Sequence, residues 1–247
     1  MSLKERIVAL KNFITDYSSR EIKILVNLFI LVTAILVFTY VAKEVISGET
    51  KEFDQWVLNN LRDNGTLKSP IAPAWFNGLM TDITALGGAT IIFMITASVV
   101  FYLLIQKQYE FMLLILVATI GGTLLSFSLK EVFARERPPL IFHLLTVKSM
   151  SFPSGHAMMS SVVYLTQGVL LAKVQSNKNL RVYILLAAVM LVFLIGLSRI
   201  YLGVHYPTDV LAGWSVGLAW ASLCWFAARY LQRRKERKKD LNLTNKY

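Results

Sequence analysis

The sequence predicts an all-α fold: a six-transmembrane-helix bundle with an interfacial amphipathic helix between the first two spans. Two observations lead to this prediction. Hydrophobic residues make up 55% of the 247 positions and charged residues only 17%, whereas a soluble domain has about 45–50% and about 25%. In addition, six long runs carry no formal charge. The segments between these runs are too short for a second domain, so we expect one integral-membrane domain over residues 1–247.

The same numbers exclude several other classes of protein. Disorder requires low hydrophobicity and high charge. Collagen-like and disulfide-rich chains need far more than 13 glycines and one cysteine. A soluble fold is excluded because it would have to bury all six apolar runs, and the chain has too few residues left to cover them. The single cysteine, Cys224, is expected to be a small buried hydrophobic residue.

Each charge-free run is long enough for one membrane helix, which needs about 20 mostly apolar residues. The first run lies between Lys23 and Lys43 and predicts a span over 24–42. The later runs predict spans over 83–105, 111–130, 155–173, 182–199 and 209–229. The sixth contains Gly213 and Gly217, a GxxxG spacing that permits close helix packing, within the bundle rather than in a dimer.

The longest segment outside the membrane runs from about residue 48 to 80 and begins with an amphipathic stretch. Five residues recur there at helical spacing, and four of them are apolar: Phe53, Trp56, Val57, Asn60 and Leu61. With Trp75 and Phe76 after the prolines, this pattern predicts a helix in the outer membrane interface. The helix is either a connector that rests there or a lid over a lipid-entry path.

The distribution of positive charge predicts the orientation. With the N-terminus inside, the cytoplasmic segments hold 17 of the 26 lysines and arginines, so both termini are expected in the cytoplasm. The basic tail RRKERKK is then a topology anchor that also meets anionic lipid. No aromatic or base-reading pattern accompanies it, so no nucleic-acid partner is expected. The first helix is expected to remain uncleaved, because no small-residue cleavage site follows it.

Ionisable residues at membrane depth are costly and indicate function. In this topology six of them fall at the outer ends of four spans: Lys130, Arg137, His156, Arg199, His205 and Asp209. Three are cations without obvious carboxylate partners, which predicts a site for a multiply charged anion such as phosphate. Lys130 and Arg137 are seven residues apart and share a helical face if the helix continues to Pro138.

The other groups supply an anion cradle and a nucleophile. Ser154 is a candidate N-cap before a helix start, where free N–H groups bind anions, and Gly155 lets an oxyanion approach the backbone. His205 and Asp209 lie one helical turn apart, so the carboxylate can hold Nδ1–H and leave Nε2 free to attack. His156 can then protonate the leaving oxygen and later activate water.

These motifs together resemble a known family. K-x6-RP at Lys130–Pro138, PSGH at Pro153–His156 and SR-x5-H-x3-D at Ser198–Asp209 are similar to the three-part signature of the type 2 phosphatidic acid phosphatase superfamily, the integral-membrane lipid phosphatases. The resemblance implies a phosphohistidine intermediate, with His205 as nucleophile, Asp209 as relay and His156 as acid and base. It implies phosphate binding by the remaining signature residues, Lys130, Arg137, Ser154, Gly155 and Arg199. It also implies no metal and no cofactor.

Several further expectations follow. Arg135 is expected to support the site or contact a headgroup, His143 to lie in a loop, and Tyr201 and Tyr206 to pack. Alternative functions are a lipid phosphotransferase on the same scaffold and a non-enzymatic lipid transporter or binding protein; the six spans make a haloperoxidase the poorer match. The expected location is a bacterial inner membrane, with the site facing outward, a lipid phosphate as substrate and no obligate protein partner. Candidate substrates are undecaprenyl diphosphate, phosphatidylglycerophosphate, phosphatidic acid and diacylglycerol diphosphate.

Overall fold

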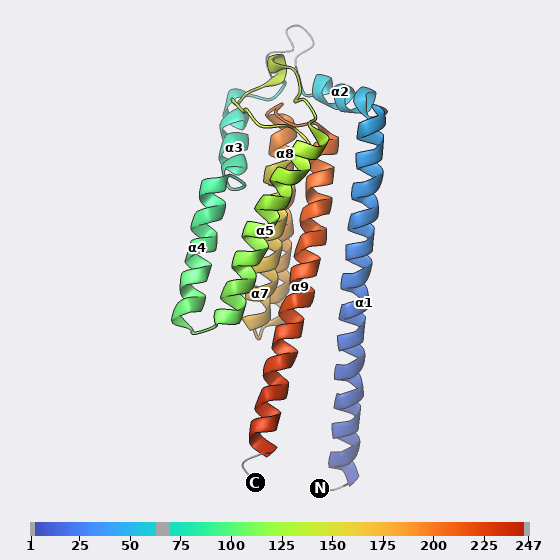
Figure 1. The fold of residues 1–247 in the computed structure, drawn as a ribbon, viewed down its shortest axis with the longest axis vertical. Helices are drawn as coiled ribbons and strands as arrows, with labels where there is room; N and C mark the ends of the chain where they lie inside the picture. Colours follow the sequence, from blue (N-terminus) through green and yellow to red (C-terminus); the bar gives the residue numbers. More distant parts are fainter. Residues whose placement is uncertain (1–2, 63–69, 245–247) are drawn as a thin grey trace.

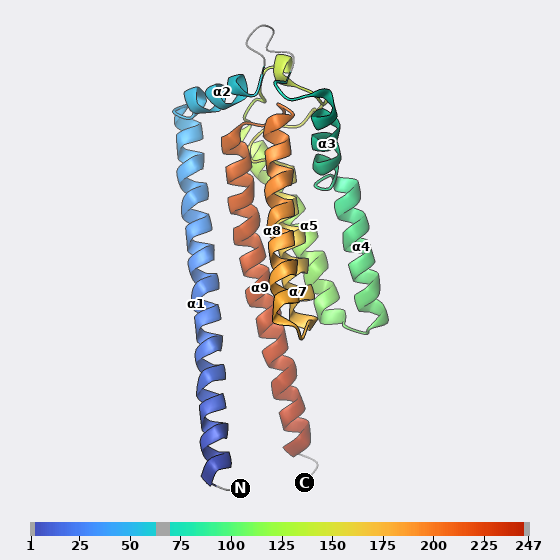
Figure 2. The same ribbon diagram turned by 180° about the vertical axis from the view of Figure 1, so that it is seen from behind.

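The computed structural model describes residues 3–62 and 70–244, and within these ranges the regular elements are helices. They form an elongated bundle in which α1 (Leu3–Ser47) begins and α9 (Pro207–Thr244) ends at the same end (Figures 1 and 2). The longest are α1 and α9, which continue beyond the loops at that end of the bundle. The others in order are α2 (Lys51–Asn60), α3 (Ala74–Ala85), α4 (Ala89–Ile105), α5 (Tyr109–Phe133), η1 (Leu140–Phe142), α6 (Gly155–Ser160), η2 (Ser161–Leu165), α7 (Thr166–Val174) and α8 (Lys178–Tyr201).

Within the described residues, five helices meet the length and hydropathy required of a membrane span, and a bent pair taken as one span makes six. Five are single helical stretches, namely Glu21–Ser47, Tyr109–Phe133, Gly155–Val174, Lys178–Tyr201 and Pro207–Leu231. The sixth is the pair α3 and α4. Large apolar side chains such as Phe29, Phe93 and Val132 are more than two-thirds exposed on the outside of the bundle, as expected of surfaces that meet lipid. The predicted six-helix membrane fold is confirmed.

The second span differs from the prediction of one helix over 83–105. It begins earlier, at Ala74, and its two halves are bent by 44° at the break between Ala85 and Ala89. Gly88 is extended there, with ψ of 152°. A Cβ on Gly87 would lie 2.5 Å from Ile195 Cγ2 of α8. The break therefore lets the chain pass closer to α8 than a continuous helix with side chains could.

The fourth span is also irregular. Residues Ser161–Leu165 form a π-helical turn between α6 and α7. Tyr164, within that turn, donates its hydroxyl to the carbonyl of Leu86 at 2.8 Å. A carbonyl freed by the break in the second span is thus satisfied by the irregular turn of the fourth.

The two glycines of the GxxxG motif bring α9 close to the fourth span. A Cβ on Gly213 would lie 2.6 Å from the Ser154 carbonyl oxygen, and one on Gly217 would lie 2.5 Å from the Met158 carbonyl oxygen. Side chains at these positions would push apart the two helices that carry the PSGH motif and Asp209. The expected packing within the bundle is therefore observed.

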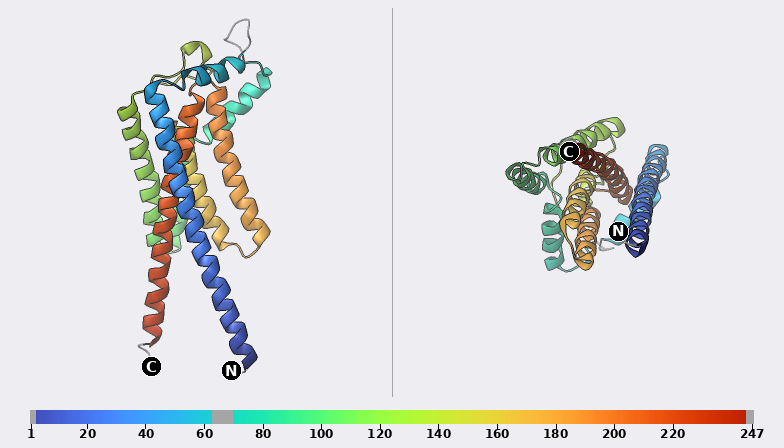
Figure 3. Two further views of the ribbon diagram at one scale, coloured as in Figure 1. Left: turned by 90° about the vertical axis from the view of Figure 1, so that its right-hand side faces the viewer. Right: turned by 90° about the horizontal axis from the view of Figure 1, so that it is seen from below.

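Helix α2 lies across one end of the bundle, between the tops of α1 and the remaining spans (Figure 3). The predicted stripe is only partly correct, because Phe53 and Trp56 are 53% and 63% exposed, while the face turned inward centres on Asp54 and Leu58. Phe53 and Trp56 thus face outward, where an interfacial aromatic residue contacts the membrane surface. The inward carboxylate was not anticipated, and its partners lie in the site described next.

Candidate active site

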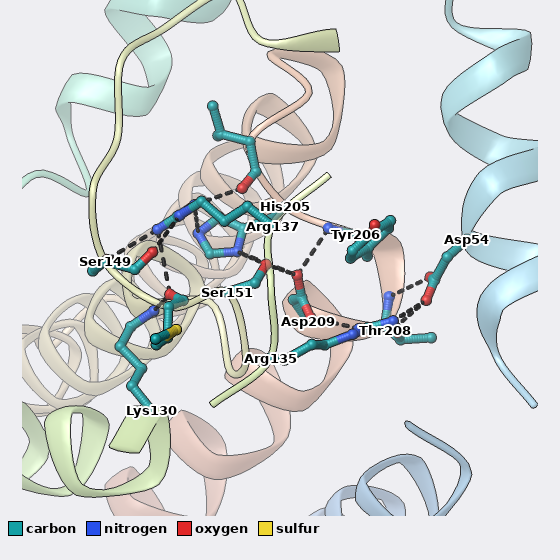
Figure 4. Close-up of polar contacts among 12 residues, drawn as sticks. Asp54, Lys130, Arg135, Arg137, Ser149, Ser151, His205, Tyr206, Thr208 and Asp209 are labelled. Carbon is teal, nitrogen blue, oxygen red and sulfur yellow. Dashed lines mark hydrogen bonds and ion pairs between the residues drawn. The ribbon is translucent and has the colours of Figure 1, made fainter. Parts of the chain in front are cut away.

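The predicted site residues gather at the end of the bundle covered by α2. Lys130 comes from the last turn of α5, and Arg199 from the last turn of α8. Ser154 and Gly155 begin α6, while His205 and Asp209 lie just before and within the first turn of α9. The loop after α5 supplies Arg137 (Figure 4). Four helix ends and one long loop therefore build a single polar cluster.

The loop begins earlier than expected. Helix α5 ends at Phe133 rather than at Pro138, because Ala134 is left-handed with φ of 44°. The helix does not continue to Arg137, so the condition under which Lys130 and Arg137 would share one helical face is not met. The chain turn instead brings Arg137 back over the site, where its Nε donates to the Ser149 carbonyl at 2.6 Å and its Nη1 to the Val204 carbonyl at 2.5 Å.

Lys130 is buried and points at the same loop. Its Nζ donates to the carbonyl of Met150 at 2.5 Å. Lys130 and Arg137 thus bind backbone carbonyls of neighbouring residues, 149 and 150, from opposite sides (Figure 4). In these contacts the two cations are held by backbone carbonyls, and no carboxylate neutralises their charge.

His205 is 1% exposed and is held at both ring nitrogens. Nε2 lies 3.2 Å from Arg137 Nη1, and Nδ1 lies 3.4 Å from Asp209 Oδ2. An arginine can only donate, so Nε2 is the acceptor and the proton is on Nδ1, facing the carboxylate. Burial first, and then the nearby cations Arg199, Arg137 and Lys130, lower the pKa of His205 well below 6.5. The imidazole is therefore neutral at physiological pH, with an unprotonated Nε2.

The Asp209 carboxylate is fully buried, and both of its oxygens accept hydrogen bonds. Oδ1 accepts from Arg135 Nη1 at 2.6 Å. Oδ2 accepts from the Tyr206 amide at 2.9 Å and from the Ser151 hydroxyl. Ser151 Oγ also lies 3.4 Å from His205 Nδ1. These contacts fix the orientation of the carboxylate relative to the ring, and the sequence analysis did not identify Ser151.

Arg135 joins Asp209 to α2. Its Nη2 lies 2.7 Å from Asp54 Oδ2, and its guanidinium stacks 4.4 Å above the Tyr206 ring. Asp54 also accepts from the Thr208 hydroxyl at 2.7 Å and from its amide at 3.2 Å. Arg135 therefore supports the site as expected, through the two buried carboxylates. Asp54 was missed because its partner lies 81 residues away.

Among the described residues, the buried donors without hydrogen-bond partners include one from each of two signature motifs, Ser154 Oγ and Arg199 Nε. The two residues are 0% and 3% exposed. Arg199 Nη1 is held by the Thr84 hydroxyl of α3 at 3.0 Å. A Cβ on Gly155 would lie 3.5 Å from Ser126 Oγ and 3.6 Å from Lys130 Cε. Unsatisfied donors and a backbone without a side chain are the features of a cradle for an anion.

His156 follows Gly155 in the first turn of α6 and faces the break in the second span. A Cβ on Gly87 would lie 3.3 Å from His156 Cδ2. The chain bend at Gly87 thus leaves room for the imidazole. Across residues 3–62 and 70–244, no three histidine, cysteine, aspartate or glutamate side chains are grouped as a metal site would require.

Comparison with known proteins matches residues 111–233 to the PAP2 superfamily model. Phosphatidylglycerophosphatase B of Bacillus subtilis (strain 168) is 40% identical over 156 residues, which are 60% of this chain and 73% of that protein. The chain belongs to the PAP2 superfamily. The matched PAP2 region contains all three motifs identified above, from Lys130 to Asp209.

Two further comparisons agree with this assignment. An undecaprenyl-diphosphatase of Sulfolobus acidocaldarius is 30% identical over 154 residues, covering 60% of this chain and 68% of that protein. The crystal structure of a transmembrane PAP2 type phosphatidylglycerolphosphate phosphatase from Bacillus subtilis superposes with a TM-score of 0.70 and 31% identity, covering 81% of this chain and 96% of that one. The protein is therefore an integral-membrane member of a family of lipid phosphatases.

Proposed function

We propose that residues 1–247 form one domain that hydrolyses the phosphate monoester or diphosphate headgroup of a membrane lipid through a phosphohistidine on His205. One observation carries the proposal. Arg137 and Asp209 hold the two ring nitrogens of His205, and burial with the nearby cations keeps the ring neutral, with the Nε2 lone pair directed into the cation cluster. A nucleophile placed among cations is suited to attack a phosphorus atom whose oxygens those cations bind.

The reaction has two steps. In the first, the Nε2 lone pair of His205 forms a bond to phosphorus while the bond from phosphorus to the lipid oxygen breaks, and protonated His156 gives that oxygen its proton. Asp209 stabilises the positive ring. In the second, neutral His156 accepts a proton from water, the water oxygen attacks phosphorus, and the P–N bond breaks to release phosphate and neutral His205.

The phosphate oxygens would be bound by the donors described above. Ser154 Oγ and Arg199 Nε are unsatisfied donors, and Gly155 leaves its backbone accessible. Lys130 and Arg137 add two charges. In the resting site Arg137 Nη1 donates to His205 Nε2, so the incoming phosphate must draw this donor away and thereby free the lone pair.

The substrate class follows from the relatives and from the site. The two relatives described above are named for phosphatidylglycerophosphate and undecaprenyl diphosphate, and both lipids end in a phosphate group that a histidine can attack. The four candidate substrates can be ranked by measuring phosphate release side by side. They are the two lipids just named, phosphatidic acid and diacylglycerol diphosphate. Recovery of a phosphorylated lipid acceptor in place of free phosphate would indicate a transferase instead.

The chemistry proposed needs no metal, because cationic side chains supply the charge that a metal ion would bring. Release of phosphate should therefore continue with EDTA present.

We also propose that both termini are cytoplasmic and that the site faces outward, on the basis of the 17-to-9 division of positive charges. Reporters fused after Gly48 or Lys148 should then be external, and those after Lys107 or Lys178 internal. An internal signal after Lys148 would reverse the orientation.

Trapping the intermediate tests the mechanism. After an acid-free quench with a lipid diphosphate radiolabelled at its terminal phosphate, wild type should show a small amount of labelled protein, labile to acid and stable to alkali. His156→Ala should accumulate more label, because a diphosphate leaves without an acid while water attack lacks its base. His205→Ala should carry none. Wild-type labelling in His205→Ala would exclude this residue as the nucleophile.

A further inference from the structure

The end of the bundle away from the active site contains a cavity without an assigned role. It has a volume of about 300 Å³ and lies between α1, α7, α8 and α9. Its walls are almost entirely apolar and include Ile30, Val169, Val189 and Leu218. Its apolar walls suit a hydrocarbon chain.

A second pocket, of about 380 Å³, continues the first toward the helix ends. The two share five lining residues, Val169, Leu170, Leu185, Trp225 and Ala228, so they adjoin, and the two together are called the path below. Four cations surround the second pocket, each from a different helix: Lys23 of α1, Lys173 of α7, Arg181 of α8 and Arg229 of α9. The path therefore changes from apolar to strongly basic along its length.

The arrangement of charge favours an anionic occupant. Two carboxylates, Glu21 and Glu110, lie near the same helix ends, but neither lines the pocket. Lys23 and Arg181 are exposed and reach the rim from opposite helices. Basic residues at a membrane surface attract anionic lipid, and each contributes about fivefold in affinity.

A buried polar group lies within the apolar part of the path. Thr166 lines the cavity and is 9% exposed, and its Oγ1 has no hydrogen-bond partner in the described portion of the chain. Thr166 is seven residues before Lys173 on the same helix, about 10 Å along its axis. The Thr166 hydroxyl therefore lies deeper in the membrane than Lys173, on the side where the ester carbonyls of a lipid, which can accept from a hydroxyl, follow its phosphate.

We propose that this path binds one anionic phospholipid from the leaflet opposite the catalytic residues. Its phosphodiester headgroup lies among Lys23, Arg181 and their neighbours, and one acyl chain enters the cavity beside Val189. The lipid is a bound structural ligand and not a substrate, so the proposal stands independently of the catalytic mechanism.

Native mass spectrometry on protein released from nanodiscs tests the headgroup contacts. Nanodiscs contain phosphatidylcholine with about one-tenth phosphatidylglycerol, whose phosphodiester a monoesterase does not consume. Wild type should retain one phosphatidylglycerol in preference to phosphatidylcholine. The double variant Lys23→Gln with Arg181→Gln should weaken this retention about 25-fold, two factors of about five. The matched control, Lys107→Gln with Lys178→Gln, removes two exposed lysines at the same end that do not line the pocket. Equal loss in both variants would show general surface attraction and overturn the site.

A second pair of variants tests the cavity. Val189 and Val182 are both on α8 and both 55% exposed, but only Val189 lines the path. Val189→Trp should fill the cavity and lower retention of dioleoyl phosphatidylglycerol, while Val182→Trp should leave it unchanged. Binding of a phosphatidylglycerol with six-carbon chains should be much less affected by Val189→Trp. Unchanged retention of the long-chain lipid in Val189→Trp would show that no acyl chain enters.

Discussion

Replacing Asp54 by asparagine tests whether α2 is joined to the catalytic carboxylate. Asp54 accepts a charge-assisted hydrogen bond from Arg135 at 2.7 Å and two hydrogen bonds from Thr208. Asparagine keeps an oxygen for Thr208, but the ion pair with Arg135 becomes a hydrogen bond from a cation to a neutral amide, or is lost. A hydrogen bond to a charged group contributes about 1.5–3 kcal/mol. The larger cost of orphaning a buried ion, about 3–5 kcal/mol, is not reached, because Arg135 keeps Asp209 as a partner.

We therefore expect Asp54→Asn to lose about 2–3 kcal/mol of stability, within the range for a hydrogen bond to a charged group. This corresponds to a fall in Tm of about 4–12 °C in a chain of this size. The free, buried Cys224 reports unfolding by its reaction with a thiol-specific dye during heating in detergent. The matched control is Asp82→Asn, which removes an exposed carboxylate of α3. Equal Tm values for Asp54→Asn and Asp82→Asn would show that the contact between Asp54 and Arg135 does not stabilise the fold.

Three further predictions follow from the site and the packing. Arg199→Lys should lose about 10²–10³ in turnover although charge is kept, because an ammonium cannot reproduce the guanidinium fork; near-normal phosphate release would make Arg199 a structural anchor. The folded-state pKa of His205 is depressed, so the unfolded chain binds the extra proton and stability should fall as pH drops through about 6.5; dye-monitored melts at several pH values should show a shallower slope in His205→Gln. Gly217→Ala should lower Tm because its Cβ meets the Met158 carbonyl oxygen at 2.5 Å, whereas Gly78→Ala, with nothing within 4 Å, should not.

The spans were predictable because hydropathy is a property of each residue and needs no partner. The charge-free runs place five of the six helices within a few residues of those in the structure, apart from the extensions of α1 and α9. The break in the second span was not predictable from hydropathy. Gly87 and Gly88 are apolar and sit inside a run without charge, and the reason for the break is a side chain of α8, Ile195, that lies 108 positions further along the chain.

The site residues also divide into those that the sequence predicts and those that depend on contacts between distant segments. Residues in short motifs, such as His205 and Asp209, could be related by helical spacing alone. The groups that orient them could not, because Arg135 reaches Asp54 only through the left-handed turn at Ala134. Prolines at 138 and 139 predicted a later end to α5. The earlier end is where the chain must turn to bring Arg135 and Arg137 over the site.

The contact between Tyr164 and Leu86 has a consequence for how this protein can change in evolution. A hydrocarbon environment offers no water to a carbonyl freed by a broken helix, and the Tyr164 hydroxyl satisfies that of Leu86. Replacing the tyrosine alone would leave a buried acceptor unpaired at a cost of about 1–3 kcal/mol. Replacing Gly87 at the break by a residue with a side chain would place a Cβ 2.5 Å from Ile195 Cγ2 and crowd His156. The two irregularities therefore constrain each other, and relatives that lose one should have lost the other as well.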